Sequence, residues 1–271
     1  MIELFEQDIK TLDRQSSKGN QLKWKKGDNW YKADYTGYEG LSEYVISNLL
    51  KYSNLDEKER VIYHLTEIKY KSVKYNGAFS RDFAKNGWQV ITLERLFNTF
   101  YGKSLHSAIH GINDEKERLL FIVNSIETIT GLKNFGKYMN KLLTIDMMFL
   151  NEDRHTHNIA VLWDGDKKFD YCPIFDNGAG LLADTTMEYP MNEDIYKLID
   201  SVKSKTFLDN FEEQTDVSEI LYGKNLTFYF TKKNVDELLD SDEAAIYPIE
   251  IRERVRRVLF EQMRRYPYLF N

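Results

Sequence analysis

Asp153, Asn158 and Asp176 have the residue types and spacing of side chains that act together on a phosphoryl group. The run 151–158 reads Asn-Glu-Asp-Arg-His-Thr-His-Asn, and the run 175–178 reads Phe-Asp-Asn-Gly. An aspartate can accept the proton of an attacking hydroxyl, and an asparagine with a second aspartate offers the oxygen ligands that Mg²⁺ prefers. Together they form the minimal polar set for transfer from Mg-bound ATP. We therefore predict Asp153 as a catalytic base and Asn158 and Asp176 as Mg²⁺ ligands.

A hairpin is predicted between the two metal ligands. Residues 159–163 are apolar strand formers, 164–166 form an Asp-Gly-Asp turn signal, and 167–174 alternate polar and apolar side chains. Because the turn lies near the midpoint, the hairpin would bring the start of its first strand beside the end of its second. Asn158 and Asp176 are therefore expected at the same open end, into which the loop of the predicted base leads.

Two other interpretations of these residues remain open. Asp and Asn are common turn residues, so each of the three alone could be structural, although their joint spacing favours chemistry. His155 and His157, with the nearby acids, could instead bind a transition metal, because imidazole and carboxylate are suitable ligands. The chain has five His and one Cys, and its sequence shows no second cluster that would complete such a set.

The composition is that of a globular protein. A chain of 271 residues can form one large domain or two lobes with a proper core. With 42% hydrophobic and 30% charged residues and four Pro, extensive disorder is not expected. The net charge of −6 argues against broad nucleic-acid binding. Cys172 has no second cysteine to pair with and is interpreted as a small core or strand residue.

No targeting or membrane segment is expected. The run 1–6 lacks the basic and long apolar regions of a secretory signal. No apolar run approaches the roughly 20 residues that a helix needs to span a bilayer. A cytoplasmic location is therefore the default expectation, and export by a non-classical route or delivery into a host cell stays open.

Strand patterns dominate the first third of the chain and helical patterns the rest. Runs 21–24 and 29–33 flank a turn signal and predict a hairpin, 41–50 has helical spacing, and 61–70 has strand character. Further helices are predicted at 93–100, 115–130, 135–150, 193–202, 234–239 and 249–265. We expect a bilobal α+β fold. A small sheet-rich lobe over 1–88 would bind nucleotide, and a larger helical lobe over 89–271 would carry the catalytic loop and the metal-binding hairpin.

Two helical segments carry charges whose role the sequence leaves open. Asp146 lies among apolar residues of the helix 135–150, where it either braces the catalytic loop by accepting backbone donors or faces solvent. The helix 249–265 interleaves apolar residues with arginines, which could bind an acidic partner or a membrane surface. The favoured alternative is that these arginines form the solvent-exposed face of the helix, opposite an apolar face that packs against the core. The arginines are at positions 252, 254, 256, 257, 264 and 265.

Lys32 is the candidate that would contact nucleotide phosphates. It stands between aromatic and small residues on a predicted strand, so a partly buried ammonium group there needs an anionic partner. Glu43 on the following helix is the natural partner, and Glu39 is a possible substitute. Kinases use a strand lysine paired with a helix glutamate to reach the α- and β-phosphates. The alternative is an exposed lysine and an exposed glutamate without this role.

Two further segments are assigned to the nucleotide. The run 16–21, Ser-Ser-Lys-Gly-Asn-Gln, is a short polar loop whose backbone N–H groups could bind an anion, with an ordinary turn as the alternative. Phosphate contacts are assigned there to Ser17, Lys18, Gly19 and Asn20. The run 78–83, which includes Ser80, is expected to cross between the lobes and to contact adenine through its backbone.

Together these motifs resemble the HipA-like kinases, bacterial Ser/Thr protein kinases whose protein-kinase-like fold is also related to phosphatidylinositol kinases. The order Asp153-Arg154-His155, reversed from the His-Arg-Asp of eukaryotic protein kinases, is the specific marker, with Asn158 at the matching offset. The run 174–178 resembles the metal-binding segment of that family. Ser, Gly, Gln and Lys at positions 16, 19, 21 and 23 reproduce the spacing of its phosphate loop.

The resemblance implies ATP and Mg²⁺ as cofactors and carries the family's roles onto matching positions. Asp153 would be the base, Asn158 and Asp176 the Mg²⁺ ligands, and Lys32 the phosphate contact, with Ser16 as an autophosphorylation site. Full-length toxins of the family carry an extra amino-terminal domain, whereas here the run that resembles the phosphate loop already begins at position 16. The chain therefore resembles the short stand-alone members, including the cell-translocating kinase type. An antitoxin partner therefore stays open.

Three functions are compatible with the sequence. The leading hypothesis is ATP-dependent transfer to Ser or Thr of a protein, including the chain itself, with the protein substrate unknown. The second keeps the fold but transfers to a small molecule or a lipid headgroup, because fold does not dictate substrate. The third is a nucleotide-binding scaffold without turnover. The presence of all the expected catalytic residues argues against it.

Overall fold

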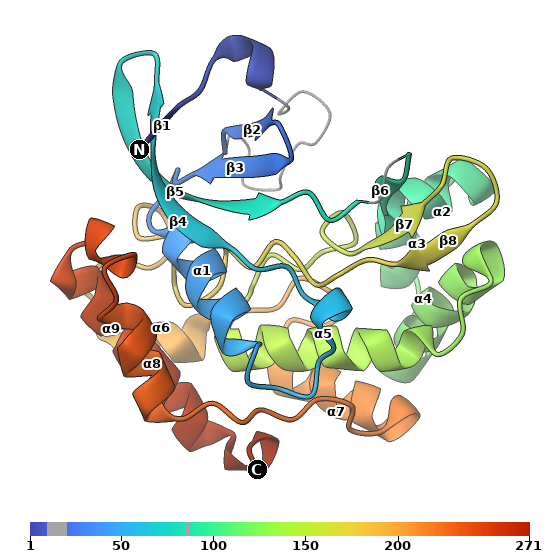
Figure 1. Cartoon of the computed structure of the whole chain (residues 1–271). Coiled ribbons are helices and arrows are strands. Elements are labelled where there is room, and N and C mark those ends of the chain that lie inside the picture. Colours follow the sequence, from blue (N-terminus) through green and yellow to red (C-terminus); the bar gives the residue numbers. More distant parts are fainter. Residues whose placement is uncertain (10–20, 85–86) are drawn as a thin grey trace. The chain divides into compact units, whose positions relative to one another are not determined.

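The computed structural model describes residues 1–9, 21–84 and 87–271 and has a mixed α+β fold (Figure 1). Contacts divide the chain into two compact units. Unit 1 comprises Met1–Asp82, Phe175–Val202 and Thr227–Asn271, and unit 2 comprises Phe83–Ile174 and Lys203–Leu226. This division is discontinuous in sequence, and the lobes expected over 1–88 and 89–271 stay a prediction.

Unit 1 combines a sheet with helices from the beginning and the end of the chain. Its strands are β1 (Ile2–Glu3), β2 (Lys23–Lys26), β3 (Asn29–Ala33), β4 (His64–Tyr70) and β5 (Val73–Arg81). Its helices are α1 (Glu39–Leu49), α6 (Ile195–Ser201), α8 (Lys232–Leu239) and α9 (Ile249–Arg265). Short 3-10 turns are η1 (Glu6–Asp8), η3 (Glu57–Glu59), η4 (Ala244–Ile246) and η5 (Pro267–Leu269).

The sheet of unit 1 has the strand order β1-β4-β5-β3-β2. All neighbouring strands pair antiparallel except β1, which pairs parallel with β4. Lys26 lies opposite Asn29 in the β2–β3 pair, so Gly27 and Asp28 form the turn. Gly27 has a φ of 59°, a left-handed conformation that glycine adopts at little steric cost. The hairpin predicted here is therefore confirmed.

Helix α1 packs unusually close to this sheet. It is buried along almost its whole length and contacts β3, β4 and β5. A Cβ atom built on Gly40 would lie 2.7 Å from the backbone carbon of Gly77 in β5, so a larger residue would push the helix away. The close approach places Glu43, one turn further along α1, within reach of β3.

Unit 2 combines the other α-helices of the described residues with a small sheet. Its strands are β6 (Gln89–Thr92), β7 (Ala160–Trp163) and β8 (Phe169–Tyr171), which form an antiparallel sheet in the order β6-β7-β8. Its helices are α2 (Leu93–Tyr101), α3 (Leu105–His110), α4 (Glu115–Thr130), α5 (Phe135–Phe149) and α7 (Phe211–Tyr222). The pairing of β7 with β8 confirms the hairpin predicted after Asn158, and Cys172, just beyond β8, is buried as predicted.

Helix α5 is the centre of unit 2. The sequence predicts one apolar face, but every residue of α5 except Lys137 and Lys141 is buried. The reason is that α5 packs against both α4 and α7, so two sides of the helix are covered. A helix fixed in this way is a rigid support for the loop that follows Phe149.

The predicted helices are present, with shifts at their ends. Helices α4 and α9 have the predicted bounds, and α8 begins two residues earlier than predicted because the Thr231 hydroxyl caps it by accepting from the Asn234 amide. The predicted strand 61–70 begins only at His64. Helices α3 and α7 were not predicted, because α3 is short and α7 mixes β-branched and polar residues that weaken the helical pattern.

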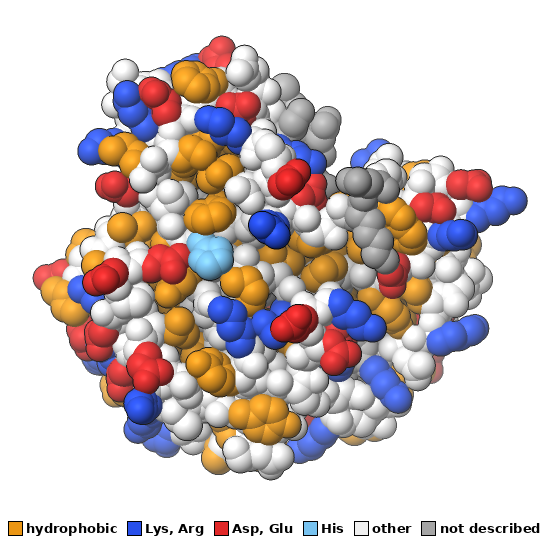
Figure 2. Space-filling view, in the orientation of Figure 1, with side chains coloured by type: hydrophobic (Ala, Val, Ile, Leu, Met, Phe, Trp, Pro, Cys, Tyr) orange, Lys and Arg blue, Asp and Glu red, His pale blue; other side chains and the backbone are white. Residues whose placement is uncertain are grey.

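The visible surface carries interspersed charges. Figure 2 shows acidic and basic side chains alternating over one face, with no broad basic area on it. In the described part of the chain, no helix is long and apolar enough to cross a membrane.

Asp34, just after β3, links that strand to the start of α1 and to Tyr247, which follows η4. Its carboxylate accepts hydrogen bonds from the Gly40 amide at 2.6 Å and from the Tyr247 hydroxyl at 2.8 Å. Burial and the nearby Glu39 carboxylate raise the pKa of Asp34 to about 7. The folded protein therefore holds a proton that the unfolded chain, with a carboxyl pKa near 3.9, releases in weak acid.

We predict that stability decreases as the pH rises from about 4 to 7, because over this range the folded state binds more protons than the unfolded state. Asp34 contributes a slope of up to about 1.4 kcal/mol per pH unit to the free energy of unfolding. Urea unfolding at several pH values should show a flatter profile for Asp34→Asn. Identical profiles for both proteins would exclude Asp34 as the source.

Candidate active site

Lys32 forms the centre of a charged cluster in unit 1. Its ammonium Nζ lies 2.5 Å from Glu43 Oε1 and 2.6 Å from Asp176 Oδ1. The side chains are 11%, 1% and 19% exposed for Lys32, Glu43 and Asp176. The predicted ion pair between Lys32 and Glu43 is therefore present, and the structure adds Asp176 to it.

The electrostatics of this cluster keep the lysine charged. Burial alone would lower the pKa of Lys32, but the carboxylates of Asp176 and Glu43 outweigh it and raise the pKa well above its usual value. The ammonium group also lies 5.2 Å from the centre of the Tyr63 ring. Burial raises the pKa of the Tyr63 phenol, and the Glu43 carboxylate adds to this, so the phenol stays neutral beside the charged groups.

A second lysine of the sheet approaches the same aspartate. Lys23 on β2 lies opposite Lys32 on β3. Directly opposite residues of an antiparallel pair project from the same face of the sheet. Lys23 Nζ lies 3.7 Å from Asp176 Oδ2, so each carboxylate oxygen of Asp176 is close to one ammonium group. The cluster thus contains two lysines and two carboxylates and is balanced in charge.

The segment that carries Asp176 is held in an uncommon conformation. Glu43 uses its second oxygen to accept a hydrogen bond from the Asn177 amide at 2.9 Å. Asp176 has a φ of 60°, in the left-handed region that non-glycine residues adopt rarely and mainly as Asn or Asp. Such conformations persist where the surroundings determine them strongly, often at functional sites.

Glu39 does not replace Glu43. Its carboxylate accepts from the backbone amides of Tyr35, Thr36 and Gly37, at distances from 2.8 to 3.2 Å. It therefore closes the loop before α1 rather than meeting Lys32. The alternative that gave Glu39 this position is wrong.

The loop after α5 carries Asp153 in unit 2 and is fixed by a buried ion pair. Asp146, fully buried, accepts from Arg154 Nε at 3.1 Å and from Asn151 Nδ2 at 3.0 Å. Leu150 ends the helix with a φ of 54°, which turns the chain directly into the loop. The solvent-facing interpretation of Asp146 is therefore wrong. Asp146 braces the loop as the other interpretation held, because its carboxylate accepts from the side chains of Asn151 and Arg154 and its backbone oxygen accepts from the Asn151 amide.

Asn158 contacts the predicted base directly. Its Nδ2 donates to the backbone oxygen of Asp153 at 2.8 Å and to Asp153 Oδ2 at 3.2 Å. Both hydrogen bonds use the amide nitrogen, which leaves the amide oxygen as a possible metal ligand. The structure thus brings Asp153 and Asn158 together in unit 2, and Lys32, Glu43 and Asp176 together in unit 1. The placement of Asp176 at the same end as Asn158 stays a prediction.

Two hydroxyl groups anchor the rest of the loop. Thr206 donates to the backbone oxygen of Arg154 at 2.7 Å, and Thr156 donates to Glu94 Oε2 at 2.8 Å. Glu94 also accepts from the amides of Leu105 and His106 and so links α2, α3 and the loop. Neither Thr206 nor Glu94 was predicted, because both are distant in sequence from the residues they hold.

Lys205 is a candidate functional residue that sequence reasoning missed. Its Nζ lies 4.0 Å from Asp153 Oδ1, and its side chain is 43% exposed. The neighbours Ser204 and Thr206 are both buried, so the backbone on each side of Lys205 is held in place. No local sequence motif identifies this lysine, because it lies more than forty residues after Asp153 in the chain.

The remaining predicted residues are placed as follows. Ser16, Ser17, Lys18, Gly19 and Asn20 lie outside the described residues. Ser80 is buried on β5 opposite Trp30, and the chain passes from unit 1 to unit 2 two residues later, after Asp82. Its role beside adenine stays a prediction.

The two predicted metal ligands are each of a type that suits Mg²⁺. A carboxylate on Asp176 and an amide oxygen on Asn158 are hard oxygen ligands of the kind that Mg²⁺ takes together with phosphates and water. Among the described residues, no group of three or more His, Cys, Asp or Glu side chains could hold a metal ion. The transition-metal interpretation of His155 and His157 therefore gains no support there.

Comparison with known proteins places the fold. No family model and no curated protein matches the chain. Among solved structures, the crystal structure of the Helicobacter pylori proinflammatory kinase CtkA is similar over 97% of this chain and 95% of that chain. The TM-score is 0.61 and the sequence identity is 16%. The chain therefore has a kinase-like α+β fold, as the sequence predicted.

The buried ion pair generates a prediction about stability. Arg154→Met would leave Asp146 buried without its cation and should lower the free energy of unfolding by about 3–5 kcal/mol. The double variant Asp146→Leu with Arg154→Met removes both charges and should recover much of that loss. Urea unfolding measures both. Arg256→Met, which breaks partly exposed ion pairs on α9, is the control and should cost roughly 1 kcal/mol or less. Equal destabilisation of the single and double variants would contradict the assignment.

Proposed function

We propose that this chain is an ATP- and Mg²⁺-dependent kinase that transfers a phosphoryl group to Ser or Thr of a protein, including its own chain. The observation that carries the proposal is the buried contact of Lys32 with both Glu43 and Asp176. A strand lysine held by a helix glutamate beside a metal-binding aspartate is the arrangement that kinases use around nucleotide phosphates. The kinase-like fold and the resemblance to HipA-like kinases support the same conclusion.

The unit 1 residues would hold the nucleotide. Lys32 and Lys23 would donate to phosphate oxygens, while Glu43 keeps Lys32 oriented and charged. Asp176, with the oxygen of Asn158, would hold Mg²⁺. The metal would supply neutralisation of phosphate charge as the bond to the leaving group breaks. The Lys32 and Lys23 ammonium groups beside the Asp176 carboxylate would turn to phosphate oxygens when that carboxylate binds the metal.

The unit 2 residues would act on the acceptor. Asp153 would accept the proton of the attacking hydroxyl, and the hydrogen bond from Asn158 fixes the direction of its carboxylate. Lys205, beside Asp153, would stabilise negative charge on the transferred group. Catalysis would then come mainly from positioning and electrostatic stabilisation, as is general for phosphoryl transfer.

We predict that the protein labels itself when incubated with Mg-ATP, with phosphate on the Ser16–Ser17 loop detectable by mass spectrometry.

Asp153→Ala should abolish transfer while ATP binding is largely retained, because the base does not hold the nucleotide. Asp176→Ala should weaken Mg-ATP binding itself. Calorimetric titration and labelled ATP separate the two effects.

Two results would contradict this proposal. Undiminished transfer by Asp153→Ala would refute its role as base. Tight ATP binding without hydrolysis, transfer or self-labelling in Mg²⁺ or Mn²⁺ would establish a scaffold instead. Labelling of an added small molecule or lipid headgroup, but never of protein, would favour the small-acceptor alternative.

Lys205 gives a separate kinetic prediction. Lys205→Met should lower kcat by about ten- to a hundredfold and change the KM for ATP by less than about threefold, because the charge acts mainly in the transition state. Lys205→Arg should retain more activity. Lys203→Met is a matched control, because Lys203 is 73% exposed and lies near Asp209 instead. An effect confined to KM, or an equal loss in the control, would refute the assignment.

A further inference from the structure

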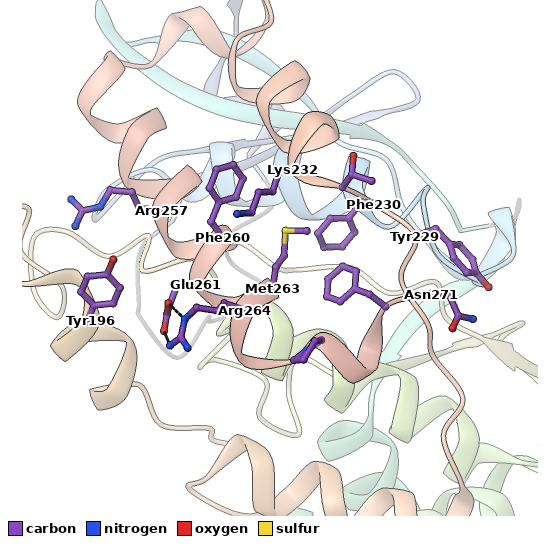
Figure 3. A pocket seen from close by; sticks show the side chains of 13 residues that line it. Tyr196, Tyr229, Phe230, Lys232, Arg257, Phe260, Glu261, Met263, Arg264 and Asn271 are labelled. Atoms are coloured by element: carbon purple, nitrogen blue, oxygen red, sulfur yellow. Dashed lines mark hydrogen bonds and ion pairs between the residues drawn. The ribbon is translucent and has the colours of Figure 1, made fainter.

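An open groove lies near the end of the chain in unit 1, formed by α8, α9, η5 and the segments beside them. Its volume is about 740 Å³. Five of its 13 lining residues are aromatic. Figure 3 shows Phe260, Met263 and Phe230 along its middle, with Arg257 at one end and Tyr229 at the other. The predicted nucleotide and metal residues do not line it, so it is distinct from the candidate active site.

Most arginines of α9 form ion pairs or hydrogen bonds with other residues of the chain. Arg254 is buried and donates to the oxygens of Tyr189 and Pro190. The carboxylate partners of the others are Asp240 for Arg252, Asp236 and Asp240 for Arg256, Glu261 for Arg264, and Glu261 with Asp200 for Arg265. The helix is therefore no uniform basic stripe. Arg257 is the exception, because it is exposed and has no hydrogen bond or ion pair with any described residue.

Lys232 is a second cation of the groove without a carboxylate partner among the described residues. Its ammonium group lies 4.9 Å from the centre of the Phe260 ring, over the groove. Lys232 is the first residue of α8, where the positive end of the helix dipole disfavours a cation. A lysine kept at this position therefore costs helix stability, which an anionic ligand would offset.

The acid in the lining does not neutralise these cations. Glu261 is 8% exposed, and hydrogen bonds from Arg264, followed by those from Arg265, lower its pKa to about 2. Its charge is thus matched by those arginines. Arg257 and Lys232 remain as excess positive charge on a chain whose net charge is −6. The groove is therefore complementary to an acidic ligand with apolar side chains.

We propose that this groove docks an acidic segment of a protein acceptor, with an aromatic or aliphatic anchor against the partly exposed Phe260 and Met263 and carboxylates at Arg257 and Lys232. This inference rests on the proposed protein-kinase function for the identity of the segment. A small-molecule site would fix its ligand by a few polar groups set within the pocket. Here both free cations have exposed, flexible side chains, as in the polar rim around the apolar core of a protein interface.

The binding test uses a short fluorescein-labelled peptide with one Phe and one Leu among Asp and Glu residues. Fluorescence anisotropy without ATP should show micromolar binding that weakens with salt. Arg257→Glu and Lys232→Glu should each weaken it at least about tenfold, because each replaces attraction with repulsion. Lys74→Glu, an equal charge change at an exposed lysine of β5, should leave it unchanged. All these side chains are exposed, and thermal melting checks that each variant folds.

A kinetic test links the groove to phosphoryl transfer. When the same acidic sequence is fused to a Ser-containing substrate, KM should fall about tenfold relative to the unfused substrate at similar kcat, because docking raises the local concentration of the hydroxyl. Arg257→Glu should remove this advantage and leave the unfused substrate unaffected. If the peptide binds but no acceptor is ever labelled, the docking surface stands and the proposed kinase function fails.

Four results would overturn the docking proposal. The first is equal binding of a control peptide with Lys in place of Asp and Glu. The second is peptide binding that Arg257→Glu leaves unchanged. The third is self-association, seen by sedimentation and lost in Arg257→Glu, which would assign the groove to a second copy of this chain. The fourth is binding of phosphatidylserine-containing vesicles without binding of the peptide, which would assign it to a membrane surface.

Discussion

The buried ammonium group of Lys32 determines how unit 1 is arranged around the candidate active site. Its two carboxylate partners lie 11 and 144 residues away in sequence. Removing three charges from water is costly unless each finds a partner at close range. The strand β3, the helix α1 and the segment around Asp176 must therefore all be in place at once. Glu43 strengthens this coupling, because it also holds the Asn177 backbone.

The two charged clusters differ in burial, and this suits different tasks. Arg154 and Asp146 are 1% and 0% exposed, so their pair is closed to solvent and serves as a brace for the loop of Asp153. Lys32 and Asp176 are 11% and 19% exposed, which leaves their outer sides accessible. A cluster of the second kind can exchange one partner for a phosphate or a metal, because the replacement restores the charge balance. The proposed function depends on this difference.

Local charge says more about partners here than net charge does. A net charge of −6 gives no sign of a groove with excess positive charge, and the six arginines at the end of the chain suggest a larger basic surface than exists. Most of them are matched by acids on or beside α8, α9 and α6, so among the described cationic residues that line the groove only Arg257 and Lys232 lack a carboxylate partner. The specificity of an acidic partner would therefore depend on two side chains beside aromatic rings.

The sequence by itself determined the features that depend on local pattern. The β2–β3 and β7–β8 hairpins follow from strand formers around turn residues, and α4 and α9 follow from apolar periodicity. The choice of Lys32 with Glu43 also succeeded, because a partly buried cation needs an acid and the next helix offers one. The burial of α5 on two sides was less visible, since periodicity shows one covered face and not how many neighbours cover a helix.

Only the tertiary structure decided the contacts between segments far apart in the chain. It showed that Asp146 faces Arg154 rather than solvent, that Glu39 closes a loop, and that Lys205 stands beside Asp153. None of these leaves a local pattern, because the partner is chosen by packing of elements distant in sequence. The candidate catalytic residues could be chosen from residue type and spacing, whereas the residues that hold and surround them depend on which buried charges the fold brings together.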